Sequence, residues 1–130
     1  MTPPPLTRIL YVEDESDIQA IARLALEQIG GFTVEICSSG RKAIEVAPEF
    51  APDLILLDVM MPEMDGITTF KALREIPQTA ITPVIFLTAK IQKQEIERYK
   101  ELGVADVIPK PFDPMTLAAT VNSIWARQHG

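Results

Sequence analysis

The sequence predicts an α/β fold in which five parallel strands form a layer between two layers of helices. Short, nearly continuous apolar runs recur along the chain, as in strands that are covered on both faces. Segments with helical spacing of apolar residues follow these runs, and such alternation is typical of β-then-α units around a parallel sheet. The strands are expected at 8–13, 32–37, 53–58, 83–88 and 105–109.

The first helix is expected over residues 16–29, after a flexible tail of residues 1–7 and the first strand. Ser16 is a suitable N-cap, and Gln19 three residues later completes a capping-box pattern. Two glycines follow Ile29 and end the helix. The apolar side chains with helical spacing are Ile18, Ile21, Ala22, Ala25, Leu26 and Ile29.

Prolines set the limits of the second and third helices. The second is expected over residues 39–47, with Pro48 and Pro52 as its boundary. The third follows the loop 60–66 and ends before Pro77, because proline does not continue a helix.

The last two helices have clear end signals. The fourth is expected over residues 92–102 and ends at a glycine. The fifth begins at Asp113 and Pro114, as N-cap and first-turn proline, and ends near Arg127. Its buried positions are expected to be Leu117, Val121 and Ile124.

Length and composition indicate one globular domain over residues 8–127. Of the 130 residues, 47% are hydrophobic and 23% are charged, which is a globular composition. A C-terminal tail of residues 128–130 is expected, with His129 as a solvated end residue. The net charge of −6 and the lack of a Lys and Arg cluster argue against direct nucleic-acid binding.

Cysteine content and hydropathy point to a cytoplasmic protein. The single cysteine, Cys37, excludes an internal disulfide and is expected to be a buried core thiol. No apolar run is long enough for a signal peptide or a membrane span. We therefore expect a soluble protein that does not contact a membrane.

Several predicted strands end on a polar residue. A (βα)5 chain of this size fits the three-layer, flavodoxin-like strand order 2-1-3-4-5, in which ligands bind outside the carboxyl ends of the strands. Glu13 ends the first strand and Asp14 follows it, Asp58 ends the third, Thr88 ends the fourth and Lys110 follows the fifth. The fold would gather these five side chains at one end of the sheet.

The three acids are suited to a divalent cation. Mg²⁺, or Mn²⁺ in its place, prefers oxygen ligands, and Asp14 and Asp58 can supply carboxylate oxygens from adjacent strand ends. Glu13 can reach the same ion directly or through a water molecule, and the Met60 carbonyl can supply a further oxygen. Three adjacent carboxylates repel one another unless a cation neutralises them.

The same end of the sheet is suited to phosphoryl chemistry. The Asp58 carboxylate can attack phosphorus to form an aspartyl phosphate. The Lys110 ammonium and the Thr88 hydroxyl can each cover an oxygen of the transferred group. A cis Lys110–Pro111 bond would aim the lysine inward, but the residues alone leave cis and trans open.

Other interpretations are weaker. Each residue alone has a simpler explanation, such as a helix-start charge for Glu13 and Asp14, yet the whole set at successive strand ends does not. A phosphatase of the haloacid dehalogenase type would need a second aspartate two residues after Asp58, where Met60 stands. A flavin or nucleotide carrier would need a phosphate-cradling loop after the first strand, where this chain is acidic. A protein of this fold that has lost phosphorylation would not need the complete set.

The chain resembles the receiver domain of two-component response regulators over about residues 8–127. The segments that carry the resemblance are Ile9–Glu15, Leu54–Gly66, Val84–Ala89 and Pro109–Phe112. The resemblance implies that Asp58 is the phosphoacceptor and that the bond before Pro111 is cis. The metal ligands that it implies are Glu13, Asp14, Asp58 and the Met60 carbonyl. It also implies that Thr88 and Lys110 bind the phosphoryl group and report its arrival.

The resemblance also implies the function and the partners. The chain would be a phosphorylation-activated signalling switch and not a turnover enzyme. Its phosphodonor would be a phosphohistidine on a sensor histidine kinase or on a histidine phosphotransfer protein. It would act alone by docking to a downstream protein, or as a receiver module of a longer protein. A phosphorylation-linked homodimer through the fourth helix, fifth strand and fifth helix is possible.

The chain departs from the family pattern at one switch position. Many members have Tyr or Phe three residues before the lysine, whereas this chain has Val107, which we expect to be buried and stiff. Transmission to the face of the last helices should therefore be weaker or different. Met60 and Lys90 occupy the two positions that tune lifetime in the family, and Met60 predicts a slow loss of phosphate. Tyr99 and Trp125 lie near this face and are expected to be exposed.

Overall fold

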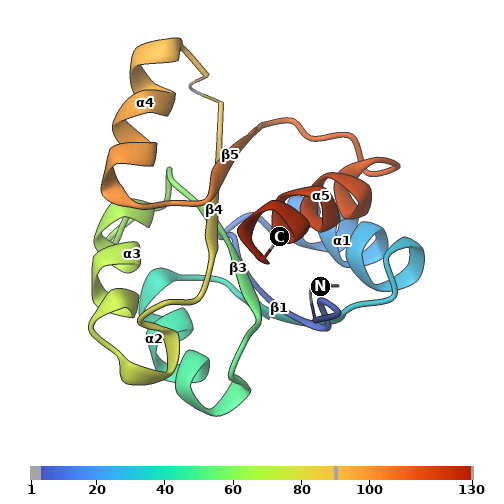
Figure 1. The fold of residues 1–130 in the computed structure, drawn as a ribbon, viewed down its shortest axis with the longest axis horizontal. Helices are drawn as coiled ribbons and strands as arrows, with labels where there is room; N and C mark the ends of the chain where they lie inside the picture. The colour runs from blue at the N-terminus through green and yellow to red at the C-terminus, as the bar shows by residue number, and fades with distance from the viewer. Residues whose placement is uncertain (1–3, 90, 130) are drawn as a thin grey trace.

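The computed structural model confirms the predicted fold class. It describes residues 4–89 and 91–129, so Lys90 lies outside the described residues. Five parallel strands form one sheet in the order β2-β1-β3-β4-β5, as predicted (Figure 1). The strands are β1 (Arg8–Val12), β2 (Thr33–Cys37), β3 (Leu54–Asp58), β4 (Val84–Thr88) and β5 (Asp106–Pro109).

Helices cover both faces of the sheet. Figure 1 shows α1 and α5 on one side and α2, α3 and α4 on the other. A separate cluster of buried apolar side chains fills the space on each side. The helices are α1 (Ser16–Arg23), η1 (Leu24–Ile29), α2 (Gly40–Phe50), α3 (Gly66–Arg74), η2 (Pro77–Thr79), α4 (Lys93–Leu102) and α5 (Leu117–His129). None of the helices in the described ranges has the length and apolarity needed to cross a membrane.

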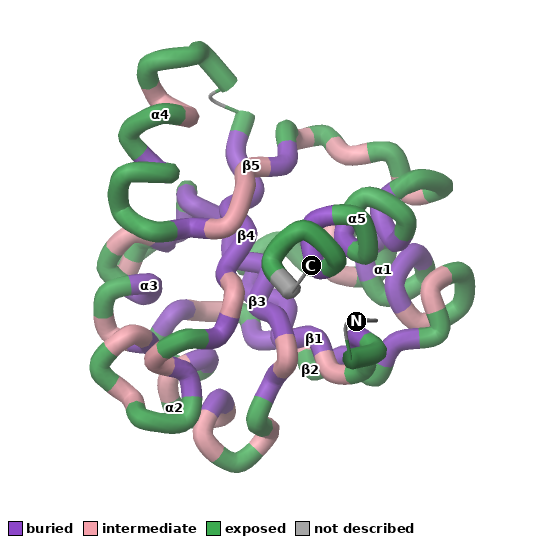
Figure 2. The backbone as a smooth tube through the Cα atoms, in the orientation of Figure 1, coloured by how far each residue is buried: buried purple, intermediate pink, exposed green. Residues whose placement is uncertain are grey.

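The central strands are buried along their whole length. All five residues of β3 and all five of β4 are buried, which agrees with their continuous apolar sequences (Figure 2). The Cys37 thiol at the end of β2 is buried as predicted, and burial raises the pKa of Cys37 to about 11. The sheet is thus a rigid platform for the residues that follow its strands.

The strand register aligns the carboxyl ends. Val12 pairs with Leu57, and Asp58 pairs with Leu87. The ladder continues one residue past the last strand, because the Lys110 amide donates to the Thr88 carbonyl at 3.0 Å. The polar residues that were predicted to converge therefore leave the sheet at the same edge.

The predicted end of the second helix is wrong. Helix α2 continues through Pro48 to Phe50. The Ala51 amide donates to the Ala47 carbonyl at 2.9 Å, so a hydrogen bond closes the last turn beyond the proline. Ala51 takes a left-handed conformation with φ of 51°, which ends the helix without a glycine.

The predicted capping box of the first helix is also wrong. Glu15 holds the N-cap position, and Ser16 is the first helical residue. The Gln19 side chain does not cap the helix but donates to the Glu13 carbonyl and to the Ser38 hydroxyl. It therefore ties the start of α1 to the loops after β1 and β2.

The second half of this helix is wider than an α-helix. Residues Leu24–Ile29 form the π-helical segment η1, in which the Gly30 amide donates to the Ala25 carbonyl five residues earlier. Not all of the positions with α-helical spacing face the core, either in this segment or in α1 before it. Ile21 is 44% exposed and Ile29 is 46% exposed, although both were expected to be buried. The predicted positions that are buried are Ala22, Ala25 and Leu26.

The two ends of the described chain lie against each other. The Trp125 indole on α5 donates to the Pro4 carbonyl at 2.7 Å, and Leu6 is buried in the cluster under α1 and α5. Trp125 is thus buried, and the expectation that it is exposed was wrong. The expected mobility of residues 1–7 stays a prediction, although residues 4–7 contact the body of the domain in this structure.

The last helix differs from its prediction at both ends. Residues 114–116 form a turn, and regular helix begins at Leu117. Asp113 stabilises this turn, because its side chain accepts from the Met115 amide at 2.9 Å and its carbonyl accepts from the Leu117 amide at 3.0 Å. The helix ends at His129, two residues beyond the predicted end at Arg127.

Candidate functional site

Three carboxylates meet at the carboxyl ends of β1 and β3. Each of Glu13, Asp14 and Asp58 offers an oxygen, and these oxygens lie within 4.8 Å of one another. Glu13 and Asp58 are almost completely buried, whereas Asp14 is exposed at the surface. We call these three residues the acidic cluster. Its spacing and oxygen chemistry fit a hard divalent cation that approaches from the solvent side.

Lys110 extends from the end of β5 into the acidic cluster. Its ammonium lies 3.0 Å from Glu13 Oε1 and 3.2 Å from Asp58 Oδ2. Burial disfavours the charged lysine, but the hydrogen bond to Glu13 and the negative charge of Asp58 together raise the pKa of Lys110 above its usual value. The lysine is thus a fixed cation beside Asp58. The Lys110–Pro111 peptide bond is cis.

Glu13 binds its proton unusually tightly in this setting. Burial raises the pKa of Glu13, the hydrogen bond from Lys110 lowers it, and Asp58 raises it again, to about 7. One positive charge from Lys110 does not balance the buried acids. A divalent cation would supply the missing positive charge and would displace the proton from Glu13.

The backbone around Asp58 fixes the direction of its carboxylate. The Met60 amide donates to Asp58 Oδ1 at 3.2 Å, while Asp58 Oδ2 faces Lys110. Gly66 makes this loop possible, since a Cβ there would lie 2.5 Å from the Asp58 carbonyl oxygen and 2.7 Å from the Val59 Cα. The absence of a side chain at Gly66 allows α3 to begin directly against the end of β3.

A hollow of about 400 Å³ opens above Asp58. It gives a ligand room to reach the buried carboxylate. Met60 stands at its rim with 61% of its surface exposed. The hollow is lined by Glu15, Ile18, Asp58, Met60, Ala89, Lys110 and Pro111.

Thr88 is the last residue of β4, the strand between β3 and β5, and it pairs with Pro109 of β5. It is completely buried, and its carbonyl accepts from the Lys110 amide. Val107 pairs with Phe86 in the adjacent strand and is half-buried, whereas full burial was expected. The structure thus brings the acidic cluster, Thr88 and Lys110 to one end of the sheet.

Two residues near the site were not predicted from the sequence. Tyr99 on α4 was expected to be exposed, but only 3% of it is exposed. Its three-residue spacing from Ile96 in an otherwise polar helix is the signal that indicates an inward position. Tyr11 lies two residues before Glu13 on the same face of β1, and its buried hydroxyl has no hydrogen-bond partner among the described residues.

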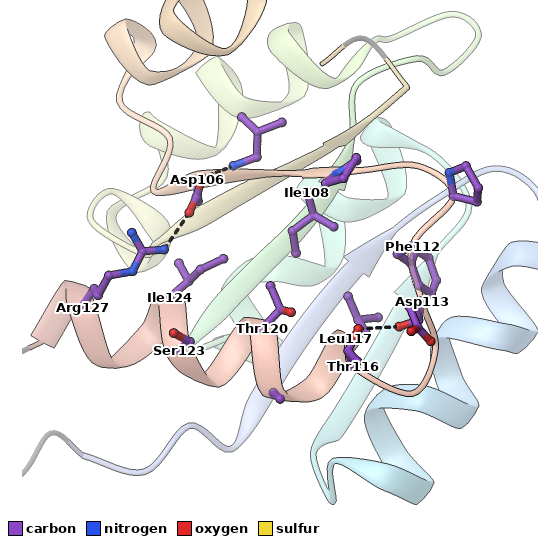
Figure 3. Close-up of a pocket in the computed structure, with 14 residues that line it drawn as sticks. Asp106, Ile108, Phe112, Asp113, Thr116, Leu117, Thr120, Ser123, Ile124 and Arg127 are labelled. Atoms are coloured by element: carbon purple, nitrogen blue, oxygen red, sulfur yellow. Dashed lines mark hydrogen bonds and ion pairs between the residues drawn. The ribbon is translucent and has the colours of Figure 1, made fainter. Parts of the chain in front are cut away.

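A second hollow, of about 500 Å³, lies between β5 and α5. Figure 3 shows Asp106 and Arg127 joined across one end of it, while Phe112 and Asp113 lie at the other end. The Arg127 guanidinium contacts Asp106 Oδ2 at 2.7 Å. None of the three residues of the acidic cluster lines this hollow.

Comparison with known proteins defines the class of this chain. The model of the response regulator receiver domain matches residues 9–122. The chain therefore belongs to the response regulator receiver domain family. It is a receiver module of two-component, phosphorelay signalling, with an acidic cluster of Glu13, Asp14 and Asp58 at the expected edge of the sheet. Receiver domains are signalling modules and not conventional enzymes, and the family implies a histidine kinase as partner.

Named relatives agree with this assignment. The chain is 40% identical over 124 residues to the transcriptional regulatory protein CpxR of Escherichia coli K12, covering 95% of this chain and 51% of the relative. It is 39% identical over 120 residues to the alkaline phosphatase synthesis transcriptional regulatory protein PhoP of Bacillus subtilis, covering 92% and 49%. The chain thus spans about half the length of these relatives.

Solved structures show the same fold. The chemotaxis protein CheY4 of Vibrio cholerae superposes with a TM-score of 0.84 and 32% identity, over 92% of this chain and 99% of that one. A putative response regulator from Chloroflexus aurantiacus superposes with a TM-score of 0.83 and 31% identity, over 95% and 100%.

Proposed function

We propose that this chain is a phosphorylation-activated switch whose phosphoacceptor is Asp58. The observation that carries the proposal is the position of the Asp58 carboxylate. It is buried, it lies 3.2 Å from the Lys110 ammonium, it belongs to the acidic cluster, and a hollow opens above it. The donor would be a phosphohistidine on a sensor histidine kinase or on a histidine phosphotransfer protein.

The transfer step follows from these contacts. An Asp58 carboxylate oxygen attacks phosphorus, the phosphorus–nitrogen bond of the donor breaks, and the histidine leaves with the electron pair of that bond. The Lys110 ammonium exchanges its contact with Asp58 for a contact with the phosphoryl oxygens. The Thr88 hydroxyl covers a second oxygen. Both residues would then report that the group has arrived.

The proposed metal site uses the same residues. Mg²⁺, or Mn²⁺, would be held by Glu13, Asp14, Asp58 and the Met60 carbonyl, and it would neutralise charge on the phosphoryl group during transfer. The acidic cluster fits such an ion, because its oxygens converge and because Lys110 alone leaves excess negative charge.

We also propose how the signal is timed. Met60 has no side-chain group that could orient an attacking water molecule, so the aspartyl phosphate should be lost slowly; Lys90 is the second position expected to tune this lifetime. Dephosphorylation that is already fast, and equally fast in Met60→Asn, would contradict this role for Met60. The measurement is the decay of the phosphorylated mass after the donor is removed.

The output of the switch has two candidate forms. The chain docks to a downstream protein by itself, or it serves as a receiver module of a longer protein, as in the relatives of which it spans about half. In either form, a phosphorylation-linked homodimer through α4, β5 and α5 is a candidate readout. Sedimentation of the phosphorylated and unphosphorylated protein distinguishes a dimer from a monomer.

The decisive experiment measures phosphorylation directly. The purified protein is incubated with acetyl phosphate, with and without Mg²⁺, and its intact mass is recorded beside those of Asp58→Asn and Asp17→Asn. We expect one added phosphoryl group that requires Mg²⁺ and is lost in Asp58→Asn. The control variant Asp17→Asn changes an exposed acid in the first turn of α1 and should still be phosphorylated. If the wild type gains no mass under any condition, the chain is instead a phosphorylation-independent interaction module.

A further inference from the structure

Helix α4 is attached to the sheet mainly through one side chain. All residues of α4 are described, and Tyr99 is its buried residue. The Tyr99 ring contacts the Phe86 ring of β4 edge-to-face, with centroids 5.2 Å apart and planes at 80°. Most other side chains of α4 are charged or polar and face solvent. The position of the helix therefore depends on the surroundings of Tyr99.

The Tyr99 phenol reaches the end of β4 where Thr88 lies. Phe86 and Thr88 are two residues apart in this strand, so their side chains point to the same face of the sheet. Burial raises the pKa of Tyr99 above its usual value, while a hydrogen bond with the Thr88 side chain lowers it and one with Glu95 raises it. The phenol thus links Thr88 of the sheet to Glu95 of the same helix.

The adjacent strand offers no comparable link. Val107 pairs with Phe86 in the strand register and has an apolar, branched side chain that cannot hydrogen-bond to Thr88. A hollow of about 650 Å³ lies between α4 and the loop that follows β3, and it gives Tyr99 room to move. It is lined by Val59, Met60, Met61, Asp65, Ile67, Glu95, Arg98 and Tyr99.

We propose that Tyr99 is the positioning residue that couples the state of Asp58 to helix α4. A phosphoryl group on Asp58 recruits the Thr88 hydroxyl, which leaves the Tyr99 phenol, and α4 loses part of its attachment to the sheet. The coupling residue is then supplied by α4 itself and not by β5. This inference rests on the proposed phosphorylation of Asp58.

The two tyrosines of the chain permit a direct test by fluorine NMR. The protein is labelled with 3-fluorotyrosine in the Tyr11→Phe background, so that the remaining signal belongs to Tyr99. Spectra are recorded before and after treatment with acetyl phosphate and Mg²⁺, and the intact mass of each sample is measured. We expect the Tyr99 signal to shift on phosphorylation and to stay in place in Asp58→Asn treated in the same way.

Two further variants test the contact itself. Thr88→Val keeps the shape of the side chain but removes its hydroxyl, so the Tyr99 signal should move without any phosphoryl group. Tyr99→Phe keeps the ring against Phe86 but removes the hydroxyl. Hydrogen exchange of the α4 amides in the unphosphorylated variant should therefore be faster than in the unphosphorylated wild type. Phosphorylation should then accelerate that exchange less than it does in the wild type.

The outcomes separate this inference from the proposed function. A sample that gains a phosphoryl group while its Tyr99 signal stays unchanged overturns the coupling and leaves the function intact. A Tyr99 signal that is unchanged in Thr88→Val overturns the contact on which the coupling depends. A sample that gains no mass overturns the proposed function, and the coupling with it.

Discussion

The buried Tyr11 hydroxyl belongs to β1, two residues before Glu13, and no described residue offers it a hydrogen bond. Burial and the charges of Glu13 and Asp58 raise the pKa of Tyr11 far above its usual value, so the phenol stays neutral. A buried hydroxyl without a partner costs free energy, because it has lost its hydrogen bonds to water. Tyr11 is therefore a residue at which a conservative change should stabilise the protein.

We predict that Tyr11→Phe increases the free energy of unfolding by about 1 kcal/mol, since it removes the unpaired hydroxyl and keeps the ring. Urea denaturation of both proteins measures the difference. The matched control is Tyr99→Phe, which removes a hydroxyl that has partners and should not stabilise the protein. Equal effects of the two changes would show that the pairing of the hydroxyl does not decide the result.

Glu13 should make stability depend on pH. The folded pKa is about 7, above the usual value of 4.5, so the folded state keeps the proton that the unfolded state releases between these pH values. The free energy of unfolding should therefore fall as the pH rises from about 4.5 to about 7, by an amount on the order of 3 kcal/mol.

Chemical denaturation over this pH range, with a chelator present, measures the contribution of Glu13. The variant Glu13→Gln removes the titrating group and keeps the size of the side chain, so the difference from the wild type isolates the effect. A wild-type profile parallel to that of Glu13→Gln would mean that the folded state does not hold this proton.

At the scale of elements, the strands are easier to predict than the ends of the helices. A strand such as β3 is buried on both faces, and its apolar residues, Leu54 to Leu57, are continuous in the sequence. The ends of helices depend on how the last backbone amides and carbonyls are paired, and several local sequences allow more than one pairing. Helix α2 continues past Pro48 because the Ala51 amide still reaches the Ala47 carbonyl four residues earlier. In η1 the Gly30 amide instead reaches the Ala25 carbonyl five residues earlier, which makes the turn π-helical.

The C-terminal end of α2 offers a single substitution that should stabilise the protein. Ala51 has a φ of 51°, a conformation that is unfavourable for residues with a Cβ and favourable for glycine. We predict that Ala51→Gly increases the free energy of unfolding by about 0.5–1 kcal/mol. The control is Ala126→Gly in α5, where the same change should decrease it by about 1 kcal/mol. Thermal or urea denaturation measures both, and a loss of stability in Ala51→Gly would contradict the prediction.

At the scale of the whole molecule, a bound cation should stabilise the folded state. An ion that binds only the folded protein adds about 1.4 kcal/mol when its concentration is ten times the dissociation constant. We predict that Mg²⁺ raises the melting temperature of the wild type and that Asp58→Asn loses most of this effect. Asp17→Asn, outside the acidic cluster, should respond like the wild type. An equal response in all three proteins would show that Mg²⁺ binds elsewhere.

The convergence of the candidate site could be predicted because it depends on topology. Parallel strands in the order 2-1-3-4-5 place Glu13, Asp58 and Thr88 at one edge whatever the detailed packing. The pairing of Lys110 with two acids and the burial of Tyr99 depend on how α4 and the loop after β5 settle on the sheet. Such contacts join residues far apart in the chain, and residue spacing alone does not determine them.

The hydrogen bond between Trp125 and the Pro4 carbonyl has a consequence for engineering. It holds the segment that precedes β1 next to the C-terminal part of α5. A domain with adjacent ends can be inserted into a surface loop of a host protein without stretching that loop. Any change in the position of α5 would then alter the separation of the two splice points, so this receiver is suited to act as an inserted sensor in a fluorescent or enzymatic reporter.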